Sequence, residues 1–376
     1  MFWFWLFAGP ALALAAFSLR GERKRARFVS DRLNLDADRP SPPATVITSI
    51  EDAEGGEDLR QNLAVLADQD YPNYELIVAA RSASDIPSGV LPSGVIVVLR
   101  GIQKNSADDR VENLLAGVQS ARRQSEILAF ADAYGHVSPR WLRALVVPLT
   151  EASVGVSTGF WWLTPEPPDF WSLLRSVWSA PIAGLLGPGD NPFAWVGSMA
   201  ILKEMFFELR IPNAWRQSIG EGAIVGRAVH GAGLRVAFAP SAMAAYSSRT
   251  SMRCFLGWAR RQLILARIYV PRLWWAALAA HFFYCGGMVA AIAASMRGSR
   301  GAEWVLVTQL GLGMLKGVNR ATLAKAELPG REAWFKRHAW VHALWVPLAT
   351  WFWLGLLVAA LFPFRVPMKK TDSSNA

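Results

Sequence analysis

A single carboxylate stands at the end of an apolar run and has the chemistry to bind a metal ion. Residues 127–131 are uncharged, and Asp132 follows them directly. In sheets of parallel strands, ligands bind beyond the carboxyl ends of the strands. Asp132 either holds a divalent cation and a phosphate or caps a turn, and we favour the first. His136 offers an imidazole that accepts Mn²⁺, although an ordinary loop histidine is the stronger interpretation.

A second acidic residue, Glu221, opens a predicted helix at 221–232. A carboxylate there can accept the proton of an attacking hydroxyl as a general base. The helix dipole also favours an acidic residue at this position without any function. Both interpretations stay open. Other candidates are polar residues at strand ends or on predicted helices, each with an ordinary surface role as its alternative: Asp85, Arg110, Asn113, Arg261 and Gln262.

The elements that must position these residues alternate between short β-rich runs and helical patterns. Apolar runs separated by helices predict βαβ units and a mostly parallel sheet covered on both faces. The predicted strands are 45–50, 75–80, 95–99, 127–131 and 234–238. The predicted helices are 57–68, 109–122, 139–150 and 221–232.

Both ends of the chain have membrane character. Residues 2–19 are uncharged, and a basic cluster follows at 20–27. A signal peptide carries its charges before the apolar run, so we expect a membrane anchor with its N-terminus outside. Residues 273–294 and 340–362 lack acidic and basic residues other than histidine and are long enough to span. The run 304–315 is too short to span securely and is expected to be re-entrant or interfacial.

A basic amphipathic helix is predicted at 252–269, just before the first long C-terminal span. Arg253, Arg260 and Arg267 recur every seven residues, which keeps them on one stripe with only ~20° of drift per heptad. This pattern is typical of a helix at the level of the lipid headgroups. The alternative is a helix that packs against the soluble part of the chain.

The composition agrees with a membrane-associated protein. The chain has 376 residues, a net charge of +10 and 18 tryptophans. Because the basic charge lies beside apolar runs, we expect an anionic membrane surface as partner and no nucleic acid. Cys254 and Cys285 provide neither a disulfide framework nor a metal-ligand spacing. A transporter or channel is disfavoured, because no charges inside the spans mark a pathway.

Six segments, in their order and spacing, resemble membrane glycosyltransferases of families 2 and 21, the latter including the ceramide glucosyltransferases. Residues 130–139 align with a metal motif in which two aspartates flank one residue. The similarity extends from about residue 43 to residue 271. The six segments are 58–75, 110–115, 130–139, 193–201, 219–229 and 258–262.

The resemblance implies a GT-A fold, which is Rossmann-like with a mostly parallel sheet, and an inverting transfer to an acceptor hydroxyl. It implies a nucleotide-sugar donor, UDP-linked, and Mg²⁺ or Mn²⁺ held by Asp132. In the family pattern Asp85 lies beside the base and ribose, and Arg110 and Asn113 lie near the diphosphate. Glu221 is then the remaining candidate for the base.

The closing basic-aromatic motif of the family resembles residues 258–262, and Arg261 and Gln262 would there provide fixed donors near the departing diphosphate. The sequence departs from the family pattern at several positions. Tyr134 replaces the second aspartate of the metal motif, and Gly222 stands where the base aspartate falls. Trp161 and Gly257 stand at positions where related sequences carry arginine.

Several tryptophans lie close together in the sequence of the soluble part. They form either an acceptor surface for a lipid or sugar, or aromatic core packing or a membrane-edge belt. They are Trp161, Trp162, Trp171 and Trp178.

We therefore expect a multi-pass protein of the bacterial inner membrane, with an α/β catalytic domain facing the cytoplasm. Its expected function is transfer of a sugar from a nucleotide-sugar donor to a ceramide-like or other lipid acceptor. The alternative is a catalytically impaired relative that serves as a binding or scaffold partner. The expected parts are an anchor (1–19), a basic linker (20–42), the GT-A domain (43–250), the interfacial helix (251–272), a transmembrane region (273–363) and a polar tail (364–376).

Overall fold

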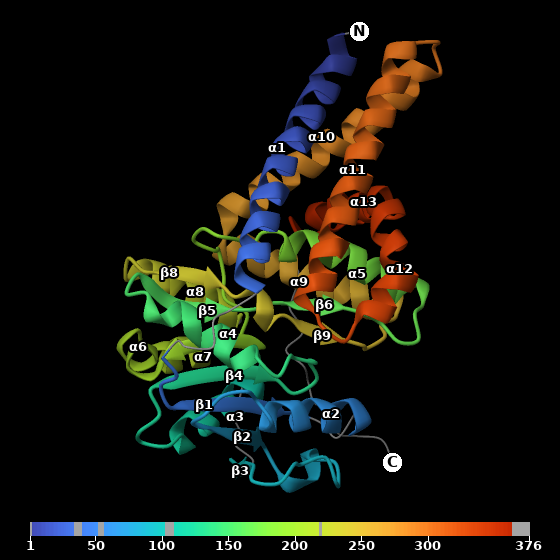
Figure 1. The fold of residues 1–376 in the computed structure, drawn as a ribbon. Helices are drawn as coiled ribbons and strands as arrows, with labels where there is room; N and C mark the ends of the chain where they lie inside the picture. Colours follow the sequence, from blue (N-terminus) through green and yellow to red (C-terminus); the bar gives the residue numbers. More distant parts are fainter. Residues whose placement is uncertain (1, 34–39, 52–55, 102–108, 218–219, 363–376) are drawn as a thin grey trace.

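The computed structural model describes residues 2–33, 40–51, 56–101, 109–217 and 220–362 (Figure 1). The predicted polar tail and residues 34–39 of the predicted linker lie outside these residues. The described chain forms a sheet domain, a layer of short strands and helices above it, and a group of upright helices.

The sheet domain holds a seven-stranded sheet in the order β3-β2-β1-β4-β7-β5-β8. Strands β3, β2, β1 and β4 are parallel, and β7 runs antiparallel to both of its neighbours. The predicted α/β class with a mostly parallel sheet is confirmed, and the five predicted strands are found to within one residue. The strands are β1 (Ala44–Ile50), β2 (Tyr74–Ala80), β3 (Ile96–Leu99), β4 (Ile127–Asp132), β5 (Val154–Thr158), β7 (Ser198–Leu202) and β8 (Arg235–Phe238).

Helices cover both faces of this sheet because each presents an apolar stripe to it. Helices α2 and α4 pack on one face, and α3, α6, α7 and α8 pack on the other. Two separate cores result, one on each side of the strands. The helices are α2 (Gly56–Ala67), α3 (Asp109–Ser120), α4 (Trp141–Val146), α6 (Lys203–Glu208), α7 (Ile211–Gln217) and α8 (Glu221–Gly231).

A second layer separates the large sheet from the upright helices (Figure 1). It contains the parallel strand pair β6 (Trp161–Leu163) and β9 (Ala244–Tyr246), with α5 (Phe170–Ala183) and α9 (Met252–Tyr269). Trp178 is fully buried here and stacks on Trp353 with ring centroids 4.2 Å apart. Core packing is therefore the correct interpretation of Trp178.

The membrane part consists of α1 (Phe2–Leu33), α10 (Pro271–Ser295) and α11 (Arg300–Glu327), which rise together and pack against one another. Among the described residues, two helices are long and apolar enough to cross a membrane, at Phe4–Leu33 and Pro271–Ser295. The expectation of a short re-entrant run at 304–315 is wrong, because that run lies within the 28-residue helix α11.

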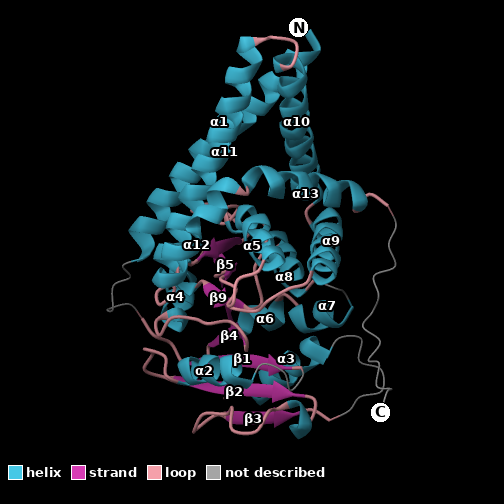
Figure 2. Cartoon of the chain, turned by 90° about the vertical axis from the view of Figure 1, so that its right-hand side faces the viewer, coloured by secondary structure: helices cyan, strands magenta, loops and turns pink. Residues whose placement is uncertain are grey.

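The last predicted span, 340–362, is divided into two helices. Helices α12 (Glu332–Leu344) and α13 (Val346–Ala359) meet at Trp345 with a bend of 64°. Figure 2 shows α13 running across the foot of the upright helices. If the bent pair is counted as one span, the described chain has three candidate spans.

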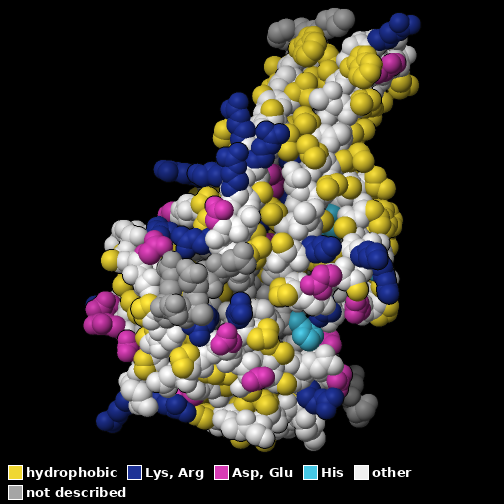
Figure 3. All heavy atoms as spheres, in the orientation of Figure 1, with side chains coloured by type: hydrophobic (Ala, Val, Ile, Leu, Met, Phe, Trp, Pro, Cys, Tyr) yellow, Lys and Arg dark blue, Asp and Glu magenta, His cyan; other side chains and the backbone are white. Residues whose placement is uncertain are grey.

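Helix α1 continues to Leu33, through residues that we expected to form a linker, because two ion pairs fix it to α11. Arg25 pairs with Glu327 at 2.7 Å, and Glu22 pairs with Arg320 at 2.6 Å. All four side chains are largely buried, so these pairs lock the helices together at this level. Figure 3 shows hydrophobic side chains over the upright helices and basic side chains gathered where α1 reaches the sheet domain.

Helix α9 begins and ends where the sequence predicts, but its apolar side lies inside the protein. Phe255, Ala259 and Leu263 are buried among residues of α5, α12 and α13. Arg267 donates to the carbonyl oxygens of Ala360 and Leu361, at 2.7 and 3.0 Å, and so caps the end of α13. The apolar face of α9 therefore packs against the rest of the protein, as the second of the two interpretations of this helix expected. Contact between the exposed arginines of α9 and lipid stays a prediction.

Candidate active site

Asp132 is the last residue of β4, at the carboxyl edge of the parallel strands. Its backbone N–H donates to the carbonyl oxygen of Gly197 at 2.9 Å. Its side chain accepts a hydrogen bond from the backbone N–H of Tyr134 at 2.9 Å. These contacts fix the turn after the strand, and the second carboxylate oxygen points to Arg110.

Arg110 provides the cation at this edge of the sheet. It lies in the first turn of α3, and its Nη1 is 3.2 Å from the carboxylate of Asp132. Although burial opposes the charged form, Asp132, Glu51 and Glu221 raise the pKa of Arg110. The charges of Asp132, Glu51 and Glu221 thus act on the guanidinium, and these groups come from β4, from the end of β1 and from α8. The sequence predicted two of these three groups.

Glu221 opens α8 and joins this cluster through its charge. Gly220 precedes it with φ of 101°, a conformation that glycine adopts without strain. The indole Nε1 of Trp215 donates to the Glu221 carbonyl at 3.2 Å, which holds the helix start. The carboxylate can therefore act as a base near Arg110, and its place at the helix N-terminus also suits the dipole.

Gly222, the position of the base aspartate in the family pattern, has no room for a side chain. A Cβ built there would lie 2.0 Å from the carbonyl oxygen of Ala194. The backbone N–H of Ala194 also donates to the carbonyl oxygen of Gly222. In this chain Glu221 is consequently the carboxylate that the start of α8 can present.

Asp85 and Asn113 lie at the same edge but are engaged in holding the protein. Asp85 accepts from Arg81 and from the backbone of Ser82, both at 3.0 Å, within a short helical turn after β2. Asn113 is buried, donates to the Ile50 carbonyl at 3.3 Å and accepts from Arg100 at 2.7 Å. Asn113 therefore positions the end of β1, and its amide does not face a ligand.

Arg261 and Gln262 lie on α9. Among the described residues, the contacts given above for Arg110, Asp132 and Glu221 involve neither of them, and their role at the diphosphate stays a prediction. Leu265, one helical turn beyond Arg261, contacts the start of α8, with its Cδ2 3.6 Å from the Cβ position of Gly220. Arg261 therefore lies one turn of α9 away from that contact, on the same side of the helix.

Tyr134 does not fill the site. Its side chain packs against the core on the α2 and α4 face of the sheet, whereas Arg110 and Glu221 come from the opposite face. Tyr246, from β9, approaches instead. A Cβ on Gly135 would lie 3.0 Å from its hydroxyl oxygen. Burial and the nearby carboxylate of Asp132 raise the pKa of Tyr246 well above its usual value.

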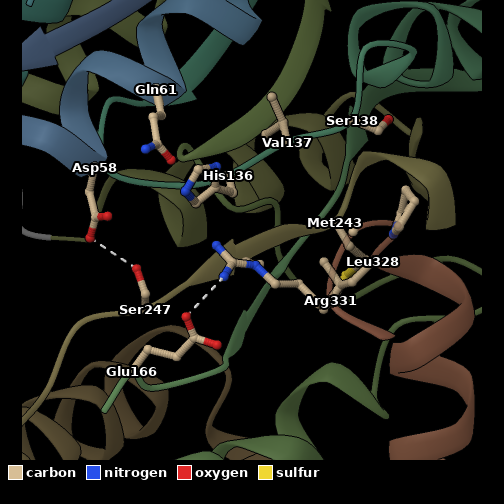
Figure 4. Close-up of a pocket in the computed structure, with 13 residues that line it drawn as sticks. Asp58, Gln61, His136, Val137, Ser138, Glu166, Met243, Ser247, Leu328 and Arg331 are labelled. Atoms are coloured by element: carbon tan, nitrogen blue, oxygen red, sulfur yellow. Dashed lines mark hydrogen bonds and ion pairs between the residues drawn. The ribbon is translucent and has the colours of Figure 1, made fainter. Parts of the chain in front are cut away.

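His136 faces a separate polar cavity of about 480 Å³ (Figure 4). Asp58 and Ser247 form a hydrogen bond of 2.9 Å in its wall, and Glu166 pairs with Arg331 at 3.9 Å. Burial and the charge of Arg331 lower the pKa of His136. The histidine thus belongs to this cavity, and the loop interpretation fits it better than a role as second metal ligand.

The residues present fit a cation that is bound by one protein carboxylate. Among the described residues, no group of three or more histidine, cysteine or acidic side chains could hold a metal. Mg²⁺ commonly binds through one or two carboxylates plus substrate phosphates and keeps several waters. Asp132 suits that role, since its partly exposed side chain lies at the carboxyl edge of the strands.

Sequence reasoning missed Glu51, Tyr246 and Arg175. Glu51 follows the first predicted strand directly, so the rule that identified Asp132 would also have identified it. Tyr246 and Arg175 come from β9 and α5, where no local pattern marks them. Only the folded chain brings them to this edge.

Comparison with known proteins gives one family match. Residues 4–180 match the family model of "Glycosyl transferase family 21". No curated protein matches the sequence.

Three solved structures have folds similar to this chain, each with a TM-score below 0.5. A mannosyltransferase from Pyrobaculum calidifontis, in complex with GDP-Man and Mn²⁺, is 18% identical with a TM-score of 0.48, and the match covers 90% of this chain and 99% of that chain. GalNAc-T7 with UDP, GalNAc and Mn²⁺ is 16% identical (TM-score 0.42, 57% of this chain, 45% of that chain). A mycobacterial protein is 17% identical (TM-score 0.39, 60% and 74%). These scores transfer neither ligands nor mechanism.

Proposed function

Since residues 4–180 are of the family 21 glycosyltransferase type, we propose that this chain is a membrane-bound inverting glycosyltransferase that transfers a sugar from a nucleotide-sugar donor to a membrane lipid. The observation that carries the proposal is the 3.2 Å pair of Arg110 and Asp132 at the carboxyl edge of the sheet, where the charge of Glu221 also acts on Arg110. This arrangement places a cation, a metal ligand and a candidate base at one edge.

The donor would bind with its diphosphate next to Arg110 and Asp132. A departing diphosphate develops negative charge, which fixed cations and donors stabilise in a water-poor site. A divalent cation, Mg²⁺ or Mn²⁺, would be held by Asp132 and would neutralise part of this charge. Asp85 stands beside the base and ribose in the family pattern, and the donor proposed from that pattern is UDP-linked.

The transfer itself is a single displacement. The acceptor hydroxyl oxygen forms a bond to the anomeric carbon while the bond from that carbon to the diphosphate oxygen breaks. Glu221 takes the hydroxyl proton, and the nucleoside diphosphate leaves with the bonding electron pair. The configuration at the anomeric carbon is inverted.

A lipid acceptor is supported by an apolar groove between α1 and α10. The groove has a volume of about 740 Å³ and is lined by small and apolar side chains that include Pro10, Leu14 and Phe17 of α1 and Phe283 of α10. Arg20 lies at its end, where the exposed basic residues of α1 begin. The hydrocarbon chain of the acceptor would lie in this groove, with its headgroup at the level of Arg20.

The same basic residues support the proposed orientation. Arg20, Arg23, Lys24 and Arg27 are exposed on α1 at the side of the sheet domain. Cytoplasmic loops carry an excess of such residues. We therefore place the sheet domain at the cytoplasmic face of a bacterial inner membrane, and the N-terminus on the opposite side.

The test uses the purified full-length protein in lipid nanodiscs made with ceramide. UDP-glucose or GDP-mannose is added with Mg²⁺ or Mn²⁺, and both release of nucleoside diphosphate and formation of glycolipid are measured. We expect transfer with inversion at the anomeric carbon, which nuclear magnetic resonance of the product reports. Donor binding without any transfer, unchanged by Asp132→Asn, would instead favour the scaffold alternative.

A further inference from the structure

Arg175 of α5 is a half-buried cation whose guanidinium lies against aromatic rings. Its guanidinium lies 4.3 Å from the ring centroid of Trp258 and 5.7 Å from that of Trp161. Its Nε atom is buried without a hydrogen-bond partner, and no carboxylate pairs with it within the part of the chain that the structure describes. Ring faces attract the charge but accept no strong hydrogen bond from the N–H groups. Burial consequently lowers the pKa of Arg175 to about 10.

Tyr246 connects this cation to the edge of the sheet. Its ring centroid lies 6.3 Å from that of Trp161, whose ring lies under the Arg175 guanidinium. Its hydroxyl reaches the turn that follows Asp132. Arg175 belongs to α5, and Figure 1 shows this helix in the layer between the large sheet and the upright helices.

We propose that Arg175, Trp161 and Trp258 form a binding site for a phosphate oxyanion. A guanidinium binds phosphate through two parallel N–H···O bonds, and stacking on rings fixes its plane in advance. The anion comes either from the diphosphate that leaves the donor or from the phosphate of a membrane lipid. Only the first source rests on the proposed function.

The sequence gives independent support for this position. The family pattern places arginines at positions 161 and 257, where this chain has Trp161 and Gly257. Arg175 contacts the ring at one of these positions and the ring of Trp258, next to the other. One guanidinium from α5 thus lies against the ring at position 161 and against the ring that follows position 257 in the sequence.

The test compares binding of two soluble probes by the full-length protein in detergent: UDP with Mg²⁺, and a short-chain phosphatidate without nucleotide. Arg175→Met keeps the apolar stem against Trp258 and removes the charge, and Arg175→Lys keeps the charge but loses the planar fork. Arg123→Met, an exposed residue of the loop between α3 and β4, is the matched control. We expect Arg175→Met to weaken at least one probe about 10- to 100-fold, with Arg175→Lys intermediate and Arg123→Met unchanged.

The probe that weakens identifies the source of the phosphate. Thermal unfolding reports whether each variant is folded, and if Arg175→Met is not, the Arg175→Lys variant decides. Binding of both probes at wild-type strength by the folded variants would overturn the site, even where sugar transfer is intact. If the wild-type chain binds no nucleotide but binds phosphatidate through Arg175, the site stands and the proposed function fails.

Discussion

The backbone of Ala194 lies so close to Gly222 that any side chain at position 222 should destabilise the folded protein. A Cβ at Gly222 would lie 2.0 Å from the carbonyl oxygen of Ala194 and 3.1 Å from its carbonyl carbon. Because the obstructing atoms belong to the backbone, they cannot rotate away as the end of a side chain could. Alanine at this position must move α8 or the segment around Ala194.

The magnitude can be worked from three glycines of the same helix. Inserting a methyl group into packed surroundings costs about 1–3 kcal/mol, and replacing a helical glycine by alanine returns up to ~1 kcal/mol. We therefore expect Gly222→Ala to lower the free energy of unfolding by about 1–2 kcal/mol. Gly226 meets the Cα of Phe193 at 3.2 Å and should respond less, and Gly231 has nothing within 4 Å, so alanine there should stabilise by about 0.5–1 kcal/mol.

Thermal unfolding of the three variants in the same detergent tests this order. For a domain of this size, 1 kcal/mol shifts the midpoint by about 2–4 °C, so Gly222→Ala should unfold roughly 2–8 °C below the wild type. Gly222→Asp should be at least as destabilised and should not raise the transfer rate. The reasoning is refuted if Gly222→Ala is as stable as Gly231→Ala, or if Gly222→Asp increases transfer.

Three further predictions concern single side chains. Asp132→Asn removes the charge that pairs with Arg110 at 3.2 Å and should weaken binding of UDP with Mg²⁺ by about 1–3 kcal/mol in calorimetric titration. Asp70→Asn, at a surface ion pair, should leave this binding unchanged. Equal affinities of Asp132→Asn and the wild type would show that Asp132 is not part of the donor site. Glu221→Gln should lower kcat about 10²- to 10⁴-fold at similar KM, with exposed Glu204→Gln as control, and unchanged kcat would show that another group takes the proton. Burial raises the pKa of Asp169, but hydrogen bonds from Ser172 and Arg249 outweigh burial and lower it. The cap that Asp169 forms on α5 therefore stabilises the fold above the unfolded pKa of ~4, and this stabilisation is lost as the pH falls through the folded pKa. Asp169→Ala should accordingly lower the unfolding midpoint at pH 7, and a difference from wild type that does not shrink between pH 7 and pH 3 would contradict the cap.

The sequence predicted the elements whose pattern is local. Five strands with apolar runs between helices were found within one residue, because each is buried and bounded by a clear change of composition. The short strands β5, β6, β7 and β9 were missed. β7 runs antiparallel within an otherwise parallel set, and its residues Ser198–Leu202 do not alternate between apolar and polar types.

In the candidate site, too, only residues marked by a local pattern could be predicted from the sequence. The rule that ligands lie at strand ends places Asp132 and Asp85 correctly at one edge, and helix starts place Arg110 and Glu221 there. Arg175 and Tyr246 depend on how a second layer packs over that edge, and such packing leaves no periodic signal in the sequence. The division of 340–362 at Trp345 was also missed, although Pro347 in the first turn of α13 is a residue that favours a helix start.

Where the sequence lacks a charged residue of the family pattern, another charged residue lies nearby in the fold. This arrangement indicates that the charged groups have moved to other positions and have not been lost. The backbone of Ala194 leaves no space for a side chain at position 222, while the charge of Glu221, the next residue, acts on Arg110. Loss of function would leave such places empty or filled with apolar side chains, since a buried charge without purpose only destabilises the fold.

Arg175 gives the same argument on the membrane side. It is a costly residue to bury without a counter-ion, yet it lies against the rings at and beside the two positions that lack arginine. A chain that only served as a scaffold would gain stability from an apolar residue there. Because α5 keeps the charge and α9 keeps the stacking ring, the two helices are built to receive an anion between the sheet edge and the membrane.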